Sequence, residues 1–106
     1  GEDAFEFERV FLDTVLDMIK KRGFSLNAFA KKAFPEDYRS DPVRRFRAMV
    51  TQGRLGKPQR INLADAYLIS KGLNMDLPYL ILIAWQGLMN QKERENATES
   101  GGGNNQ

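Results

Sequence analysis

The sequence predicts an all-α fold, a compact bundle of about five helices. Apolar side chains recur at intervals of three and four residues in five separate segments. Capping residues, glycines and prolines stand between these segments, where helices are expected to begin and end. The chain has 106 residues, of which 42% are hydrophobic and 28% are charged, which is the balance of one small globular domain.

The first two helices are expected over residues 9–22 and 26–34. Residues 1–8 are acidic and are expected to form an N-terminal extension. Gly23 follows the first helix, as glycine commonly does after a helix C-terminus. Ser25 is a suitable N-cap for the second helix, and Pro35 stops that helix because proline disfavours the helical conformation in the residue before it.

The third helix is expected over residues 42–52. Asp41 is a suitable N-cap, Pro42 suits the first helical position, and Gly53 is expected to end the helix. The preceding stretch "PEDYRS" is polar and typical of a turn, so the connection between the second and third helices is long.

Two further helices are expected near residues 63–71 and 77–91. Asn62 is a candidate N-cap for the fourth helix, which Gly72 would end, and Asp76 is a candidate N-cap for the fifth. The helical domain is therefore expected to span residues 9–91. Residues 92–106 are polar, with three consecutive glycines, and are expected to form a disordered tail.

The stretch "YLILIAW" (79–85) places seven apolar residues in a row. A helix on the surface of a small domain buries about half of such a run. One alternative is a buried strand or a helix in the centre of the core. The other is a self-association surface, and its candidate residues are Tyr79, Ile83, Trp85 and Met89.

The charge is unevenly distributed along the chain. Between Lys20 and Arg60 there are twelve basic and three acidic side chains, a net charge of +9, and the remainder carries −7. This asymmetry predicts one positive face on the folded domain. A polyanion is the expected partner, although an acidic protein surface or an anionic lipid would also fit.

The third helix carries much of this positive charge on one side. Its apolar side is expected to be formed by Val43, Phe46, Met49 and Val50, and the opposite side by Arg44, Arg45 and Ala48, with Arg47 and Thr51 at one margin. A solvated helix face usually mixes arginine with glutamate, but no acid lies between Arg44 and Arg60. Arginine is well suited to bidentate contacts with guanine edges or phosphates, so we favour a surface that binds a polyanion.

The order of these segments resembles the lambda repressor–Cro (XRE-like) family of helix-turn-helix domains. "SLNAFAKKAF" resembles that family's second helix, and "VRRFRAMVTQG" resembles its recognition helix. "GRLGKPQRINLADAYLISKGLNMDLPYLILIA" is similar to its following loop and its fourth and fifth helices. The resemblance covers roughly residues 9–85. It implies a lambda repressor-like fold with an extended turn between the second and third helices.

The resemblance also implies sequence-specific binding of double-stranded DNA, as in a phage or plasmid-type repressor or an antitoxin-like autoregulator. The N-terminal half of the third helix would enter the major groove, and the fifth helix would form a homodimer. The residues expected to read bases are Arg39, Ser40, Arg44, Arg45 and Ala48. Those expected to hold phosphates are Ser25, Lys31, Arg47, Thr51, Gln52, Arg54, Lys57 and Arg60.

Other functions are less well supported by the sequence. The alternative is a protein-interaction module whose basic face docks an acidic partner. The chain contains no histidine and no cysteine, which removes the commonest general base and the commonest metal ligands. We therefore expect no enzymatic activity, no metal, no cofactor and no small-molecule ligand. A cytoplasmic location without membrane contact is expected, because no apolar run is long enough to cross a bilayer.

Overall fold

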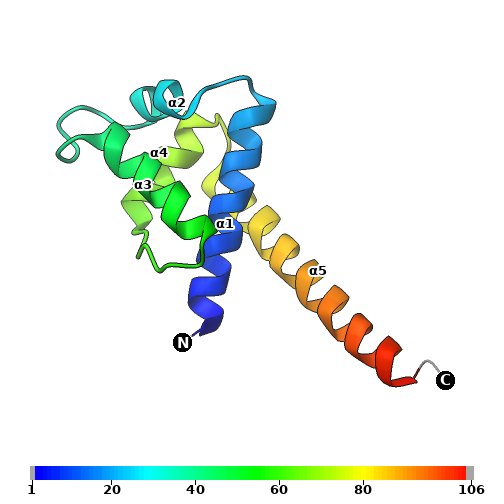
Figure 1. Ribbon diagram of the computed structural model, residues 1–106. Helices are drawn as coiled ribbons and strands as arrows, with labels where there is room; N and C mark the ends of the chain where they lie inside the picture. The colour runs from blue at the N-terminus through cyan, green and yellow to red at the C-terminus, as the bar shows by residue number, and fades with distance from the viewer. Residues whose placement is uncertain (1, 105–106) are drawn as a thin grey trace.

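The computed structural model describes the backbone of residues 2–104 and the side chains of residues 3–97. Five helices form in chain order: α1 (Glu2–Lys21), α2 (Leu26–Ala33), α3 (Pro42–Arg54), α4 (Leu63–Gly72) and α5 (Leu77–Asn104) (Figure 1). No strand forms between residues 2 and 104. The all-α expectation is confirmed, and the strand alternative for residues 79–85 is wrong because that stretch lies within α5.

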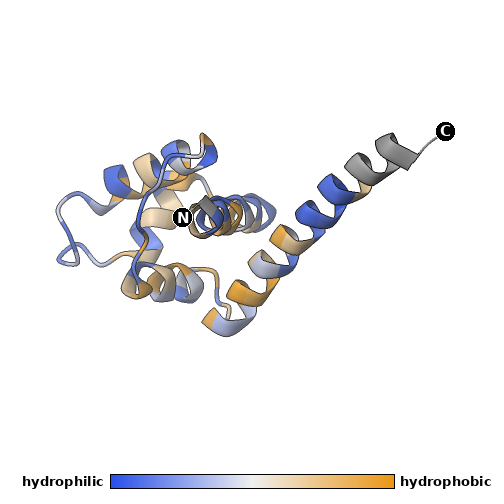
Figure 2. Cartoon of the chain, turned by 90° about the horizontal axis from the view of Figure 1, so that it is seen from below, coloured by the Kyte–Doolittle hydropathy of each residue, from blue (hydrophilic) through white to orange (hydrophobic). Residues whose placement is uncertain are grey.

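Helix α1 lies at the centre of the bundle. It packs against α3 on one side and α5 on the other, while α2 packs against α3 and α4, and α4 also contacts α5 (Figures 1 and 2). The C-terminal half of α5 leaves the other helices and extends the molecule to 59 × 24 × 22 Å. The first half of α5 is largely apolar, and the coloured residues that follow it are largely polar (Figure 2), so the first half supplies the apolar side chains that pack on the bundle.

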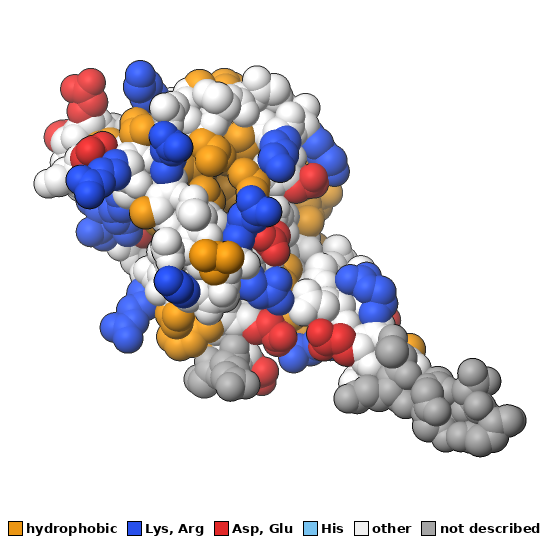
Figure 3. Space-filling model, in the orientation of Figure 1, with side chains coloured by type: hydrophobic (Ala, Val, Ile, Leu, Met, Phe, Trp, Pro, Cys, Tyr) orange, Lys and Arg blue, Asp and Glu red, His pale blue; other side chains and the backbone are white. Residues whose placement is uncertain are grey.

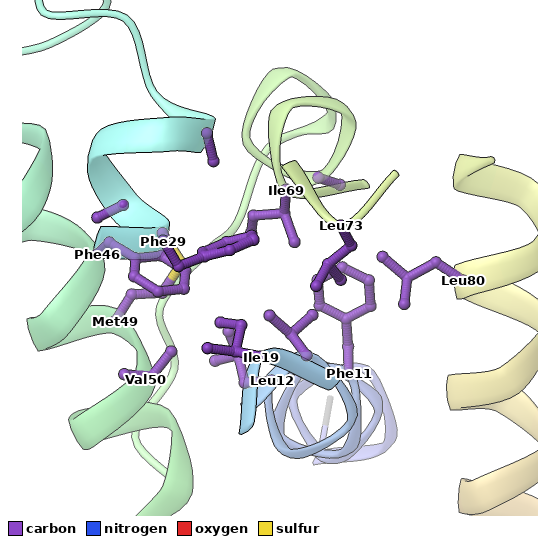
Figure 4. Packing of buried hydrophobic residues seen from close by; sticks show 14 of the residues in the cluster. Phe11, Leu12, Ile19, Phe29, Phe46, Met49, Val50, Ile69, Leu73 and Leu80 are labelled. Atoms are coloured by element: carbon purple, nitrogen blue, oxygen red, sulfur yellow. The ribbon is translucent and has the colours of Figure 1, made fainter. Parts of the chain in front are cut away.

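One hydrophobic core joins all five helices. Leu12 and Ile19 of α1 meet Phe29 of α2, Phe46 of α3 and Leu80 of α5, each fully buried (Figure 4). Full burial of one such side chain stabilises the fold by about 1.5–3 kcal/mol. Helix α2 has only 8 residues, too few for a stable isolated helix in water, so the burial of its apolar face holds it in place.

The expected N-caps form at three helices. The Ser25 hydroxyl accepts a hydrogen bond from the Ala28 N–H, and the Asp41 carboxylate accepts one from the Arg44 N–H, each at 3.1 Å. Asn62 and Asp65 form a reciprocal capping box at the start of α4. Each cap satisfies N–H groups that a helix N-terminus leaves without a partner.

One glycine, Gly53 in α3, does not have the role that the sequence predicted for it. Gly53 does not end α3, which continues to Arg54. It is buried, and a Cβ there would overlap the Leu12 side chain of α1. Gly53 therefore permits close packing of α1 and α3, and the left-handed residue of the following turn is Gly56, with a φ of +82°. Gly23 has a φ of +80° and follows α1 as expected.

Two helix boundaries, the start of α1 and the end of α5, also differ from those that the sequence predicted. Residues 2–8 are not an extension but the first turns of α1, because Phe7 packs on the core and Glu8 binds the loop before α4. Helix α5 does not stop near Gln91 but continues to Asn104. Lys92 pairs with Glu6 at 3.0 Å, which ties this part of α5 to α1. Of the expected disordered tail, residues 105–106 lie outside the described residues, as does residue 1 of the expected extension.

Over the described residues, none of the helices combines the length and the apolar character that a membrane span requires.

Candidate nucleic-acid interface

A cationic stripe runs along the outer side of α3. Phe46, Met49 and Val50 are buried in the core, and this burial turns the opposite side of the helix to solvent. The stripe is defined by five exposed residues at successive helical turns, and basic side chains gather over this part of the molecule in Figure 3. Its members are Arg44, Arg47, Ala48, Thr51 and Arg54.

Arg45 points away from this stripe. Its guanidinium donates two hydrogen bonds to the carboxylate of Asp65 on α4, at 3.1 and 2.9 Å. The Asp65 side chain is fully buried, whereas that of Arg45 is 29% exposed. The expectation that Arg45 faces outward beside Arg44 is therefore wrong, because α4 supplies a buried partner on that side of α3.

Several other hydrogen-bonding or cationic groups surround the Asp65 carboxylate. The Tyr38 hydroxyl binds it at 2.8 Å, the Asn62 N–H binds it at 3.3 Å, and the Arg39 guanidinium lies 4.0 Å away. Burial by itself would raise the pKa of the Asp65 carboxyl. The hydrogen bonds from Arg45, Tyr38 and the backbone of Asn62 outweigh burial and hold the pKa below its ordinary value. Asp65 is therefore an anion that joins α3, α4 and the connection before α3.

The long connection between α2 and α3 is folded against the core. Tyr38 stacks on the buried Phe34, with ring centroids 6.0 Å apart, and its N–H binds the Pro35 carbonyl at 3.0 Å. Arg39 lies over the Tyr38 ring at 5.4 Å. Arg39 and Ser40 are exposed just before the N-terminus of α3. The two expected base readers in this connection are thus adjacent to the stripe.

The loop between α3 and α4 is held by α1. The two carboxylate oxygens of Glu8 accept hydrogen bonds from the N–H groups of Gln59 and Ile61, at 2.6 and 2.9 Å. Arg60 has a φ of +57°, an uncommon conformation for arginine, and its side chain is exposed, as is that of Lys57. Glu8 thereby fixes the backbone that carries two of the expected phosphate contacts beyond the C-terminus of α3.

The remaining expected phosphate contacts are more scattered. Ser25 is exposed at the start of α2 and borders the same groove as Thr51 and Arg54. Lys31 is exposed on α2, away from that groove. Gln52 is half-buried at the margin of α3. The fold thus brings most of the expected contacts to α3 and its two flanking segments, and leaves Lys31 and Gln52 at the periphery.

Helix α5 presents an apolar face to solvent. Tyr79 and Trp85 are 57% and 50% exposed, and Leu82 between them is also exposed. Ile83 and Met89 are half-buried. All four expected dimer residues are therefore at least partly accessible on α5, and Leu82 lies among them although it was not among the residues expected there.

Two functional positions were missing from the sequence-based expectation. Asp65 had a detectable signal, since Asn62 followed three residues later by an acid is the spacing of a capping box. Glu8 had none, because its partners are backbone N–H groups more than fifty residues away in the chain.

No protein-family model matches the chain, and the searches of curated proteins and of solved structures found no match either.

Proposed function

We propose that this chain binds double-stranded DNA through the cationic stripe of α3 and the two segments that flank it, and that it acts as a small transcriptional regulator. The proposal extends the resemblance of residues 9–85 to the lambda repressor–Cro family. In such an arrangement α3 occupies the major groove, and cations at both ends of the helix bind the phosphate backbone.

The observation that carries the proposal is the contrast between Arg45 and its neighbours. Arg45 is neutralised inside the protein by Asp65. In the described part of the chain, the guanidinium groups of Arg44, Arg47 and Arg54 form no ion pair with a carboxylate within 4.0 Å. These three cations follow one side of an exposed helix, and packing of the fold does not require them. Their mutual repulsion is relieved when they bind a polyanion.

The structure alters the roles that we assign along α3. Arg44 and Ala48 remain the leading candidates for contacts with base edges, with Arg39 and Ser40 before them. Arg45 is no longer assigned to base contacts, because both terminal nitrogens of its guanidinium bind Asp65. We assign it instead to holding α3 in position against α4. Arg47 is exposed on the stripe beside Ala48 and keeps its assignment to a phosphate contact.

The apolar face of α5 supports a homodimer as part of the same proposal. A soluble monomer rarely exposes a contiguous large apolar patch, and Tyr79, Leu82 and Trp85 lie within two turns of one helix. Sedimentation equilibrium of the parent chain and of Trp85→Glu tests this part. A dimer that Trp85→Glu dissociates is expected, and a parent chain that stays monomeric at high concentration would contradict a stable free dimer.

Selection of bound sites from a random duplex library tests the DNA-binding proposal. The expected result is an enriched motif, in two half-sites related by symmetry if the chain binds as a dimer. Recovery of sequences indistinguishable from the starting library would show that the stripe does not read bases.

A further inference from the structure

A groove lies beside the cationic stripe, at the junction of three helix ends. The C-terminal part of α1, the start of α2 and the end of α3 line this groove, which has a volume of about 580 Å³. Its wall is largely apolar and includes Ile19, Phe24, Leu26 and Leu55. Figure 3 looks onto this face and shows hydrophobic side chains in its centre, with Lys and Arg side chains to either side.

DNA binding leaves the apolar part of this groove unexplained. A phosphate backbone is polar and charged, so it gains nothing from Phe24 or Leu26. Leu55 is 69% exposed at the edge of the groove and extends the apolar wall formed by Phe24 and Leu26. This contiguous apolar surface fits a ligand with apolar groups.

The edge of the groove carries positive charge and therefore favours a ligand with anionic groups. Lys20 and Arg54 stand on it, and neither pairs with an acid among the residues whose side chains are described. Ser25 and Leu26 begin α2, so the positive end of that helix dipole faces the groove as well. A ligand that fits must therefore combine apolar and anionic groups.

The shape of the groove favours a peptide over a small molecule. Small-molecule sites usually enclose most of their ligand, whereas this groove is open to solvent. A ligand that covers Leu55 and pairs with both Lys20 on α1 and Arg54 on α3 contacts both helices at the edge of this open groove. A protein segment with a large apolar side chain flanked by carboxylates meets both needs.

We propose that this groove is a docking site for an acidic segment of a partner protein, which inserts an aromatic or aliphatic side chain among Phe24, Leu26 and Leu55. The carboxylates of the segment pair with Lys20 and Arg54. If the chain binds DNA as proposed above, the segment displaces DNA, since Ser25, Thr51 and Arg54 border the groove and are also assigned to phosphates. The docking itself does not depend on DNA binding.

A fluorescein-labelled short peptide with a central phenylalanine between glutamates tests the docking by fluorescence anisotropy. We expect saturable binding by the full chain, and at least roughly fivefold weaker binding when alanine replaces the phenylalanine of the peptide. Leu55→Ser should weaken binding by a similar factor. Leu63→Ser is the matched control, because Leu63 is 80% exposed on α4 and lies outside the groove.

The outcomes separate the two proposals. Absence of peptide binding, or equal binding by the parent chain and Leu55→Ser, would overturn the docking site whatever the chain does with DNA. A peptide that binds through Leu55 while no duplex binds at low salt would uphold the docking site and remove the DNA-binding function. Peptide binding that leaves a bound duplex undisturbed would overturn the displacement. Arg60→Gln should weaken duplex binding alone, since Arg60 lies outside the groove.

Discussion

Arg45 on α3 and Asp65 on α4 form a two-bonded ion pair whose carboxylate is fully buried, with N–O distances of 3.1 and 2.9 Å. The same carboxylate also binds the Tyr38 hydroxyl. One carboxylate of α4 thus binds both α3 and the connection before it.

Replacement of Asp65 by alanine should destabilise the fold. Arg45 and Tyr38 would lose their common acceptor, and α4 would lose half of its capping box. Breaking a buried pair costs about 3–5 kcal/mol, and the partial exposure of Arg45 lowers the expected loss to about 2–4 kcal/mol. Urea unfolding followed by circular dichroism measures it. Asp13→Ala is the control, because its pair with Arg9 is exposed and should contribute less than about 1 kcal/mol.

The stabilisation from Asp65 should depend on pH in the acid range. The pKa of Asp65 is lowered in the folded protein, so its contribution is complete above the unfolded-state value of about 3.9 and is lost as the pH falls through the folded-state value. The free energy of unfolding should therefore differ most between the parent and Asp65→Asn near neutral pH, and this difference should narrow in acid. A difference that stays constant from neutral pH to about pH 2 would contradict an ionised Asp65.

Two helical glycines should respond in opposite ways to alanine. Gly53→Ala should destabilise the fold by about 1–3 kcal/mol, because the added methyl group overlaps the buried Leu12 side chain. Gly87→Ala places its methyl group 3.5 Å from Val10, an ordinary contact, and should be neutral or stabilise the fold by up to about 1 kcal/mol. Thermal unfolding of both variants makes the comparison. Equal effects would mean that α1 and α3 are not in close contact at Gly53.

Alanine substitutions of the neighbouring residues Arg44 and Arg45 should have different effects, the first on DNA binding and the second on the free energy of unfolding. Arg44→Ala should leave stability nearly unchanged and weaken binding to a selected site by ~1–3 kcal/mol more than binding to random duplexes, if its contact with a base is bidentate. Arg45→Ala should lower the free energy of unfolding, because it leaves the buried Asp65 without its main partner. An equal loss on all duplexes would instead make Arg44 a phosphate contact.

The sequence predicted the five helices because each has an apolar face and a recognisable start or end. The caps at Ser25, Asp41 and Asn62 are local features, so they could be read from neighbouring residues. The partner of Arg45 could not, since Asp65 is twenty residues away and only the packing of α4 brings it near. A helical wheel describes one helix by itself and gives no information on neighbouring helices. It therefore placed Arg45 on the outer face of the helix.

The same reason accounts for the errors at the start of α1 and at Gly53. Acidic residues 2–8 resemble a solvated extension until Phe7 is packed on the core and Glu8 is bound to the backbone of Gln59 and Ile61. A glycine near the end of a helix usually terminates it, and only the approach of Leu12 shows that Gly53 is needed for packing.

The salt dependence of duplex binding by the parent chain tests the central claim most directly. If the cations of α3 and its flanking segments neutralise several phosphates, the logarithm of the association constant should fall linearly with the logarithm of the salt concentration. Arg47→Gln and Arg60→Gln should each reduce the magnitude of that slope by about one. Absence of binding to any duplex even at low salt would contradict the assignment of the α3 surface to DNA.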